Sequence, residues 1–323
     1  MRSLPALAAA TCLLAAAPSP ALADGSIVLL PSIGRPTQVT VTGRALKSNP
    51  ERDASALREN LRRLTAKSWE HVAIEVHFQG ATHVVTSDDD GMFEVSFPAP
   101  REQPFALGAL PIQASAGSVS GEGTVLVVAD DAPFLVISDF DDTAAVSNVQ
   151  SKKTMLKTAL MDDDSTQPAV EGMADFYSCL ARGSPSPGFA FVTGSPVEYG
   201  ARLQAFLSRH RFPAAALLLR HLSPKTLSGF KEPVLRSLLS RFPQKVVLIG
   251  DSGEKDPEVY AALRAEFPKR VAAIFIRDVG KSAQASRFDG MTLFKTAAQA
   301  ARAAASAGLA DPECVAKAFP DGS

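Results

Sequence analysis

The sequence predicts an α/β protein in which a parallel sheet follows a smaller β-sandwich. After Pro133, short apolar strands alternate with helical stretches, which is typical of βα units and of a parallel sheet. Before Pro133, most segments alternate apolar and polar residues with a period of two, and turn signals separate them, as in a sandwich. Polar residues also follow the ends of several later strands, where the ligand sites of open α/β sheets lie.

The chain has 323 residues, which is long enough for two domains. We expect a leader at 1–23, a β-sandwich domain at 24–130, an α/β domain at 131–310 and a loosely held tail at 311–323. The formal net charge of −1 argues against a broad nucleic-acid-binding surface, so we expect no nucleic-acid partner.

The leader has the features of a secretory signal peptide. Arg2 precedes an alanine-rich apolar run, and Ala21-Leu22-Ala23 is a small-residue cleavage site. The run is well short of the roughly 20 residues that span a bilayer. We therefore expect cleavage after Ala23 and a secreted or periplasmic protein. In such a compartment Cys179 and Cys314 could form a disulfide or stay free, and the sequence leaves both alternatives open.

Alternation predicts strands throughout the first domain, with a hairpin turn at Asp90-Gly91. The expected strands lie within 27–44 (two strands around a turn) and at 71–78, 82–87, 92–97, 112–117 and 123–128. A helix is expected at 53–68, where leucines recur on one face. In the second domain we expect strands at 134–138, 189–193, 215–220, 245–250 and 271–277, and helices at 168–182, 196–209, 229–241, 256–267 and 292–308.

The first strand of the second domain ends in a group of carboxylates. The apolar run 134–138 is followed by Asp139-Phe140-Asp141-Asp142-Thr143. Buried charge must be paired or metal-bound, and a hard cation such as Mg²⁺ prefers carboxylate oxygens. By itself this pentapeptide is equally compatible with a solvated acidic loop. A calcium-binding loop is excluded, because its sixth position is Ala144 and not glycine, and its twelfth is Gln150 and not glutamate.

Three further strand ends carry side chains that suit phosphoryl chemistry. Thr193, with Ser195 as the alternative, offers a hydroxyl for one phosphoryl oxygen next to a helix start. Lys231 opens a helix, from which its ammonium could reach a phosphate and offset the carboxylates. Asp251 follows Gly250 at the end of 245–250, where it can ligate a cation. Asp256 either joins the metal shell or caps the next helix.

The order Asp-x-Asp-x-Thr, Thr, Lys and Gly-Asp-x-x-x-x-Asp resembles the motifs of haloacid dehalogenase-type phosphatases, which have a Rossmann-like parallel sheet. The strings SDFDDT, VTGSP, LIGDSGEKDPEVY and FPKRVAAIFIRDV more closely resemble the catalytic domain of the actin-patch-associated phosphatidate phosphatase family. This resemblance implies a Mg²⁺-dependent phosphatase that hydrolyses phosphatidate to diacylglycerol and phosphate. The matching positions are Asp139, Asp141, Thr143, Thr193, Lys231, Asp251 and Asp256.

The chemistry assigns a role to each position. Asp139 is the expected nucleophile, and Asp141 the acid and then the base of a two-step displacement. Asp142 and Thr143 are expected to hold the geometry of the loop. The expected metal ligands are Asp139, Asp141 through its backbone carbonyl, Asp251 and Asp256.

The substrate is less constrained than the reaction. The chain has Thr193-Gly194-Ser195-Pro196 where the family usually has Ser-Asn-Ser-Pro, and Val197 where a tryptophan is usual. The expected partner is a phosphorylated lipid or a small phosphomonoester. The alternatives are a secreted phosphatase for soluble phosphomonoesters or phosphoproteins, and a binding module with a vestigial phosphatase domain. Lysines at 152, 153 and 157 belong either to an interfacial helix attracted to a membrane surface or to an ordinary core-packed helix.

Overall fold

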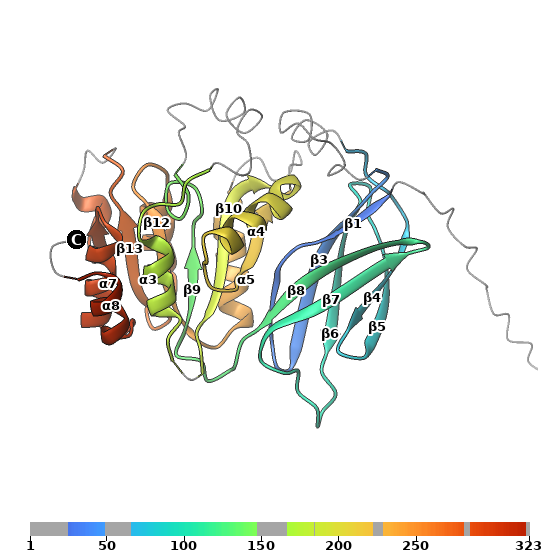
Figure 1. The fold of residues 1–323 in the computed structure, drawn as a ribbon, viewed down its shortest axis with the longest axis horizontal. Helices are drawn as coiled ribbons and strands as arrows, with labels where there is room; N and C mark the ends of the chain where they lie inside the picture. The colour runs from blue at the N-terminus through green and yellow to red at the C-terminus, as the bar shows by residue number, and fades with distance from the viewer. Residues whose placement is uncertain are drawn as a thin grey trace, which may run out of the picture.

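The computed structural model describes residues 25–48, 66–146, 167–183, 185–221, 229–280 and 285–320. The described strands form two separate sheets, one on each side of the molecule in Figure 1. The first sheet is built from residues before 128 and the second from residues after 133. The expected signal peptide, most of the expected helix 53–68 and the lysines of the 152–157 stretch lie outside the described residues.

The first sheet has eight strands, ordered β1-β3-β2-β8-β7-β4-β5, with β6 paired to the free side of β3. The strands are β1 (Ser26–Leu29), β2 (Ser32–Arg35), β3 (Gln38–Leu46), β4 (Ala73–Phe78), β5 (Ala81–Thr86), β6 (Met92–Pro98), β7 (Gly108–Ala116) and β8 (Val119–Val127). Their pairings are antiparallel except that of β2 with β8. A turn is present before β6, where the Gly91 N–H donates to the Asp88 carbonyl at 3.0 Å and Gly91 has a positive φ of 73°. The predicted hairpin is wrong, because β6 pairs with β3 while β5 pairs with β4.

Alternating burial explains how this sheet folds over one core. Val39 and Val41 of β3 share an apolar cluster with Ile74 and Val76 of β4, which lies far from β3 in the strand order. Side chains that alternate along a strand point to opposite faces, so only one face of each strand contributes to this core. The two ends of the hydrogen-bonded sheet therefore enclose common apolar side chains. The finer classification as a β-sandwich stays a prediction.

The second sheet is parallel throughout, which confirms the predicted α/β architecture. Its strands are β9 (Phe134–Ser138), β10 (Gly188–Pro196), β11 (Ala216–Arg220), β12 (Lys245–Asp251), β13 (Val271–Arg277) and β14 (Thr292–Phe294), in the order β11-β10-β9-β12-β13-β14. The chain builds outward from β9 to β11 and then returns to β12 on the other side of β9. Ligands of open α/β sheets bind at such a reversal, at the carboxyl ends of the strands.

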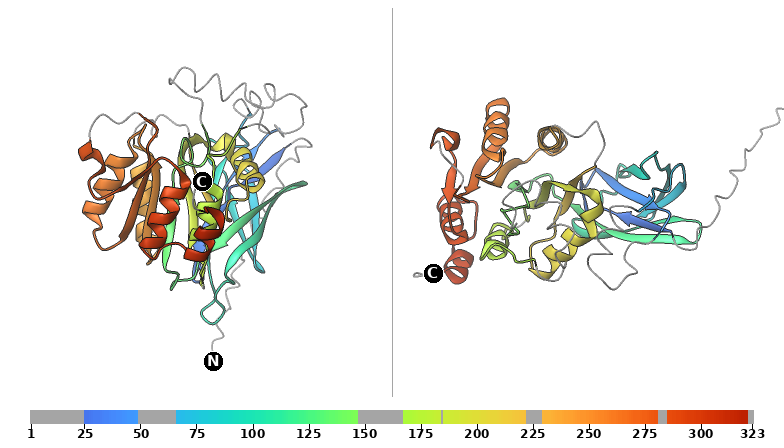
Figure 2. Two further views of the ribbon diagram at one scale, coloured as in Figure 1. Left: turned by 60° about the vertical axis from the view of Figure 1, so that its left-hand side comes forward. Right: turned by 90° about the horizontal axis from the view of Figure 1, so that it is seen from above.

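Helices cover both faces of the parallel sheet (Figures 1 and 2). One face packs against α3 (Met173–Leu180), α4 (Gly200–Arg209), α7 (Ala297–Ser306) and α8 (Pro312–Ala318). The other face packs against α5 (Lys231–Arg241) and α6 (Asp256–Glu266). Burial on both faces explains why β9 reads as a continuous apolar run and not as an alternating one. Short 3₁₀ turns occur at η1 (Val197–Tyr199) and η3 (Ala285–Phe288).

The helix predicted at 292–308 is partly wrong. Its first residues form β14, the sixth strand of the parallel sheet, and α7 begins only at Ala297. A capping box explains this start, because the Thr296 side chain accepts a hydrogen bond from the Gln299 backbone while the Gln299 side chain caps the Thr296 backbone. Among the described residues, no helix is long and apolar enough to cross a membrane.

The tail predicted to be loosely held instead forms α8, whose first turn is capped by the Asp311 side chain. This helix is joined to α3 by a disulfide between Cys179 and Cys314, with the two Cα atoms 5.4 Å apart. Val315 and Phe319 are buried in the core that covers this face of the sheet. The prediction failed because seven helical residues show too little periodicity to reveal an apolar face.

Loss of the disulfide should destabilise the protein. The bond closes a loop with a sequence separation of 135 residues, and the chain-entropy model gives such a loop about 5 kcal/mol. We expect the free energy of unfolding, measured by urea denaturation, to fall by several kcal/mol when the wild-type protein is reduced. The double variant Cys179→Ala/Cys314→Ala is the control and should not respond to reductant. Equal stability of the oxidised and reduced wild type would contradict the prediction.

Candidate active site

Asp139 lies at the carboxyl end of β9, where the strand order reverses. Its backbone N–H donates to the Ile249 carbonyl of β12 at 2.9 Å, so the main chain beside the carboxylate is fixed to the neighbouring strand. Below it, the Ser138 hydroxyl donates to the Asp139 carbonyl at 2.6 Å and hydrogen-bonds the Tyr177 hydroxyl. The side chain of Asp139 is 4% exposed. Its position is therefore defined by the sheet on both sides of the residue.

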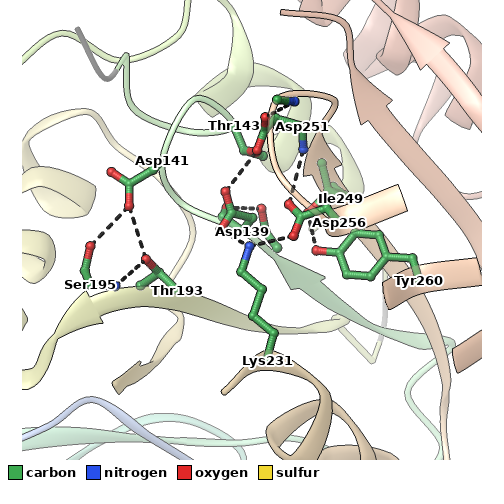
Figure 3. Close-up of polar contacts among 12 residues, drawn as sticks. Asp139, Asp141, Thr143, Thr193, Ser195, Lys231, Ile249, Asp251, Asp256 and Tyr260 are labelled. Carbon is green, nitrogen blue, oxygen red and sulfur yellow. Dashed lines mark hydrogen bonds and ion pairs between the residues drawn. The ribbon is translucent and has the colours of Figure 1, made fainter. Parts of the chain in front are cut away.

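Four side chains from four elements converge at this point (Figure 3). Carboxylate oxygens of Asp139, Asp251 and Asp256 all lie within 4.8 Å of one another, and all three residues are buried. The Lys231 ammonium at the start of α5 lies 2.7 Å from Asp139 Oδ1 and 2.6 Å from Asp256 Oδ1. The side chains that the sequence placed at separate strand ends and helix starts are thus brought into one cluster.

The cluster carries more negative charge than one lysine neutralises. Burial, and then the charge of Asp139, raise the pKa of Asp251 to about 6. The same two causes raise the pKa of Asp256 to about 8, although Lys231 opposes them. Burial lowers the pKa of Lys231, but Asp139 and Asp256 outweigh it and the net shift is upward. Without a further cation, the folded protein relieves this repulsion by retaining protons on its carboxylates.

This set of donors fits a hard divalent cation. Three carboxylates within reach of one another offer only oxygen ligands, which suit Mg²⁺, Mn²⁺ or Ca²⁺ and not the softer transition metals. A bound cation would also supply the positive charge that the raised pKa values show to be missing. The buried cluster could therefore hold a metal, as the sequence predicts.

The alternative that Asp256 caps its helix is wrong. Lys255 occupies the capping position of α6, and no side chain makes a capping hydrogen bond there. Asp256 faces the cluster instead, and its Oδ2 accepts a 3.3 Å hydrogen bond from the Asp251 backbone. This approach requires Gly250, since a Cβ at that position would lie 2.5 Å from Asp256 Oδ2. Gly250, which we predicted as a supporting residue, thus leaves room for the Asp256 carboxylate.

The Asp141 carboxylate points away from the cluster (Figure 3). It accepts hydrogen bonds from Ser195 Oγ at 3.1 Å and from Thr193 Oγ1 at 3.3 Å. Burial, and then the charge of Asp139, raise its pKa to about 6, although both hydroxyls oppose the shift. Among the described residues, the group of carboxylates that could hold a metal therefore does not include that of Asp141. A metal contact through the Asp141 backbone carbonyl stays a prediction. Thr193 and Ser195 both contact Asp141, so they remain alternatives for the hydroxyl predicted to bind a phosphoryl oxygen.

The side chains of Thr143 and Arg277 help to hold the loop between Asp139 and Thr143. The Thr143 hydroxyl donates to Asp139 Oδ2 at 3.3 Å. The Asp142 backbone has an unusual positive φ of 54°, and its carbonyl accepts a 2.6 Å hydrogen bond from Arg277 Nη1. Arg277 was missed by the sequence reasoning, although its place at the end of β13 follows the same rule that identified the other residues.

Two buried tyrosines were also missed. Tyr260 of α6 donates to the Ile249 carbonyl at 3.1 Å, the same carbonyl that accepts from the Asp139 backbone. Tyr177 of α3 hydrogen-bonds Ser138, the residue that precedes Asp139. In the sequence each tyrosine reads as one more apolar residue on a helix face, so no signal distinguishes it from ordinary core.

Comparison with known proteins shows that most of the α/β domain is similar to the catalytic domain of a phosphatase family. Residues 134–278 match the family model described as "Phosphatidate phosphatase APP1, catalytic domain". The resemblance predicted from the sequence strings is therefore confirmed over this segment.

The chain also matches two fungal relatives, but it spans well under half of the length of each. An uncharacterized protein of Schizosaccharomyces pombe is 28% identical over 235 residues, which are 67% of this chain and 36% of the relative. Phosphatidate phosphatase APP1 of Saccharomyces cerevisiae is 27% identical over 150 residues, 44% of this chain and 25% of the relative. Among solved structures, a carbohydrate acetylesterase from Xanthomonas citri is 13% identical, and the match covers 86% of this chain and 66% of the acetylesterase chain. Its TM-score of 0.33 is too low for any conclusion.

The raised pKa values predict how the stability of the metal-free protein depends on pH. Asp251 and Asp256 have pKa values of about 6 and about 8 when folded, against about 4 in an unfolded chain. The folded state binds more protons, so this stabilisation is complete below about pH 4 and is lost as the pH rises through 6 and then 8. We expect the free energy of unfolding in the presence of a chelator to decrease over that interval, and added Mg²⁺ to restore it.

The variant Asp256→Asn is the control for this measurement. It resembles the protonated aspartate at every pH, so the decrease between about pH 7 and 9 should be much smaller than in the wild type. An unchanged pH dependence in this variant would show that Asp256 does not retain a proton in the folded state.

Proposed function

We propose that this chain is a Mg²⁺-dependent phosphatase that hydrolyses phosphatidate to diacylglycerol and phosphate through an aspartyl-phosphate on Asp139. One observation carries the proposal: the convergence of Asp139, Lys231, Asp251 and Asp256 at the reversal of the parallel sheet. The match of residues 134–278 to a phosphatase catalytic domain supports it. The parallel sheet is then of the Rossmann-like, haloacid dehalogenase type.

In the first step Asp139 attacks the phosphorus atom, forming a bond from its carboxylate oxygen while the ester P–O bond breaks. Lys231 binds one carboxylate oxygen of Asp139 and Thr143 the other, so the nucleophile is held in one orientation. Asp139, Asp251 and Asp256 would hold Mg²⁺, which supplies positive charge that offsets the charge of the phosphoryl oxygens. Thr193 at the end of β10 is the proposed donor to one of those oxygens.

Asp141 handles the protons. Its raised pKa of about 6 keeps a fraction of the side chain protonated near neutral pH, so it can protonate the leaving alkoxide. In the second step the ionised Asp141 takes a proton from water, the water oxygen bonds to phosphorus, and the bond from phosphorus to Asp139 breaks. Thr193 and Ser195 hold this carboxylate apart from the cluster, so it remains available for proton transfer.

The proposed substrate rests on the family match and on the name of the Saccharomyces cerevisiae relative, a phosphatidate phosphatase. Phosphatidate lies in a membrane surface, so we propose peripheral contact with such a surface during turnover. We also propose a secreted or periplasmic location. The disulfide between Cys179 and Cys314 supports that location, because such bonds persist in oxidising compartments.

Phosphate release from phosphatidate in mixed micelles tests the function. We expect Mg²⁺-dependent release by the wild type, and a loss of at least about 10³-fold in Asp139→Asn, since that variant lacks the attacking group. Asp175→Asn changes an exposed aspartate of α3 and should retain activity. A small chromogenic phosphate ester is assayed in parallel. Activity on that ester alone would favour the soluble-substrate alternative, and activity retained by Asp139→Asn would refute the assigned nucleophile.

Asp141→Asn should separate the two steps. A nitrophenolate leaving group needs no proton, so the variant should still release one equivalent of nitrophenol per enzyme from nitrophenyl phosphate. It should then stall, because water is no longer deprotonated and that step slows by about 10²- to 10⁴-fold. Rapid-quench kinetics would show this burst. Steady turnover without a burst, at the wild-type rate, would remove Asp141 from the second step.

A further inference from the structure

An ion pair joins the first domain to the segment that follows β10. Arg44 of β3 contacts Glu198 of η1, with 2.7 Å between Nη1 and Oε1, and their side chains are only 13% and 11% exposed. Taking two charges out of water is costly, and only good geometry with further hydrogen bonds compensates the cost. The pair is therefore better suited to defining a position than an exposed surface ion pair.

The guanidinium is fixed on its own domain by the turn at Asp90. Arg44 Nε donates to the Asp90 carbonyl at 3.3 Å and Nη2 donates to Ser68 Oγ at 3.4 Å. Ser68 Oγ in turn donates to the same Asp90 carbonyl at 2.9 Å. The planar fork of an arginine is well suited to such multiple contacts. Arg44 thus reaches the other domain from a fixed position.

Glu198 lies three residues after Ser195, in a stretch that the sheet does not hold. The register of β10 with β11 shifts between Thr193 and Pro196, so regular pairing is interrupted where the site residues lie and resumes at Pro196. Across this irregularity Ser195 N–H donates to Thr193 Oγ1 at 3.1 Å, and both hydroxyls hold the Asp141 carboxylate. A displacement of Glu198 would therefore move Ser195, and with it the side chain that transfers protons.

We propose that Arg44 is a positioning residue for the phosphatase reaction. Through Glu198 it fixes the irregular stretch of β10, and so the place of Asp141 relative to Asp139. The first domain is then part of the catalytic unit and not an independent binding module. This inference rests on the proposed function for its effect on turnover, but the contact between Arg44 and Glu198 and its effect on the β10 stretch do not.

A second ion pair of the first domain provides a matched control. Arg35 of β2 contacts Asp130 at 2.7 Å and donates to the Arg241 carbonyl at 3.3 Å. Helix α5 begins with Lys231 in the site and ends at Arg241, so this contact lies at the opposite end of the helix. Arg35→Ala therefore removes a contact between the domains without touching the site.

Two readouts test the proposal with Arg44→Ala, Glu198→Gln and Arg35→Ala in the full chain. The first is kcat and KM for nitrophenyl phosphate with saturating Mg²⁺. Misplacement of a catalytic group costs on the order of 10²-fold, so Arg44→Ala and Glu198→Gln should lower kcat by about 10- to 100-fold with KM changed little. Arg44→Lys keeps the charge and should recover part of the loss, and Arg35→Ala should leave kcat within about twofold. The second readout is hydrogen exchange of peptides that cover 193–199, which should be faster in Arg44→Ala and unchanged in Arg35→Ala.

Each outcome decides between the alternatives. Equal losses of kcat in Arg44→Ala and Arg35→Ala would show a general effect of domain contact and overturn the proposal. Unchanged exchange in both Arg44→Ala and Glu198→Gln would overturn it as well. An inactive wild type would refute the proposed function alone, and the exchange measurement would then still decide whether Arg44 positions the β10 stretch.

Discussion

The structure depends on the compensation of negative charge where β9 and β12 lie side by side. Asp139, Asp251 and Asp256 are brought together there by the strand order, and Lys231 is the only lysine or arginine that contacts Asp139 or Asp256 in the described ion pairs. Two neighbouring contacts keep these groups close together. The Ile249 carbonyl accepts a hydrogen bond from the Asp139 backbone, and Gly250 leaves space for the Asp256 carboxylate. The repulsion among the closely packed carboxylates makes the cluster suitable for a cation.

Much of this could be predicted from the chain itself, because the relevant information is local. A short apolar run followed by acidic residues is enough to predict a buried strand that ends in carboxylates. In a parallel sheet, Asp139 and Asp251 must then lie at the same edge, where the carboxyl ends of the strands meet. Roles that depend on the orientation of a side chain could not be predicted from the sequence as well. Whether Asp256 capped a helix or entered the cluster was undecided from the sequence, and the structure decides it through the place of Lys255 at the helix start.

The remaining features depend on contacts between distant residues, and periodicity does not encode these. Glu198 pairs with Arg44 across 154 positions, and each reads as an ordinary charged residue in its own segment. Tyr260 reads as an ordinary core residue, although its hydroxyl donates to the Ile249 carbonyl, which also accepts from the Asp139 backbone. The strand β14 has only three residues, too few for any pattern, and it exists because β13 offers it a free edge.

The disulfide closes a covalent loop through most of the α/β domain. The bond joins α3, shortly after the Asp139 strand, to the last described helix, and Lys231, Asp251 and Asp256 all lie in the chain between its two cysteines. A single proteolytic nick anywhere in that interval leaves one covalent molecule, in which Asp139 and the other residues of the cluster cannot diffuse apart. The oxidised protein can thus tolerate cleavage between its two cysteines in a way that the reduced protein cannot.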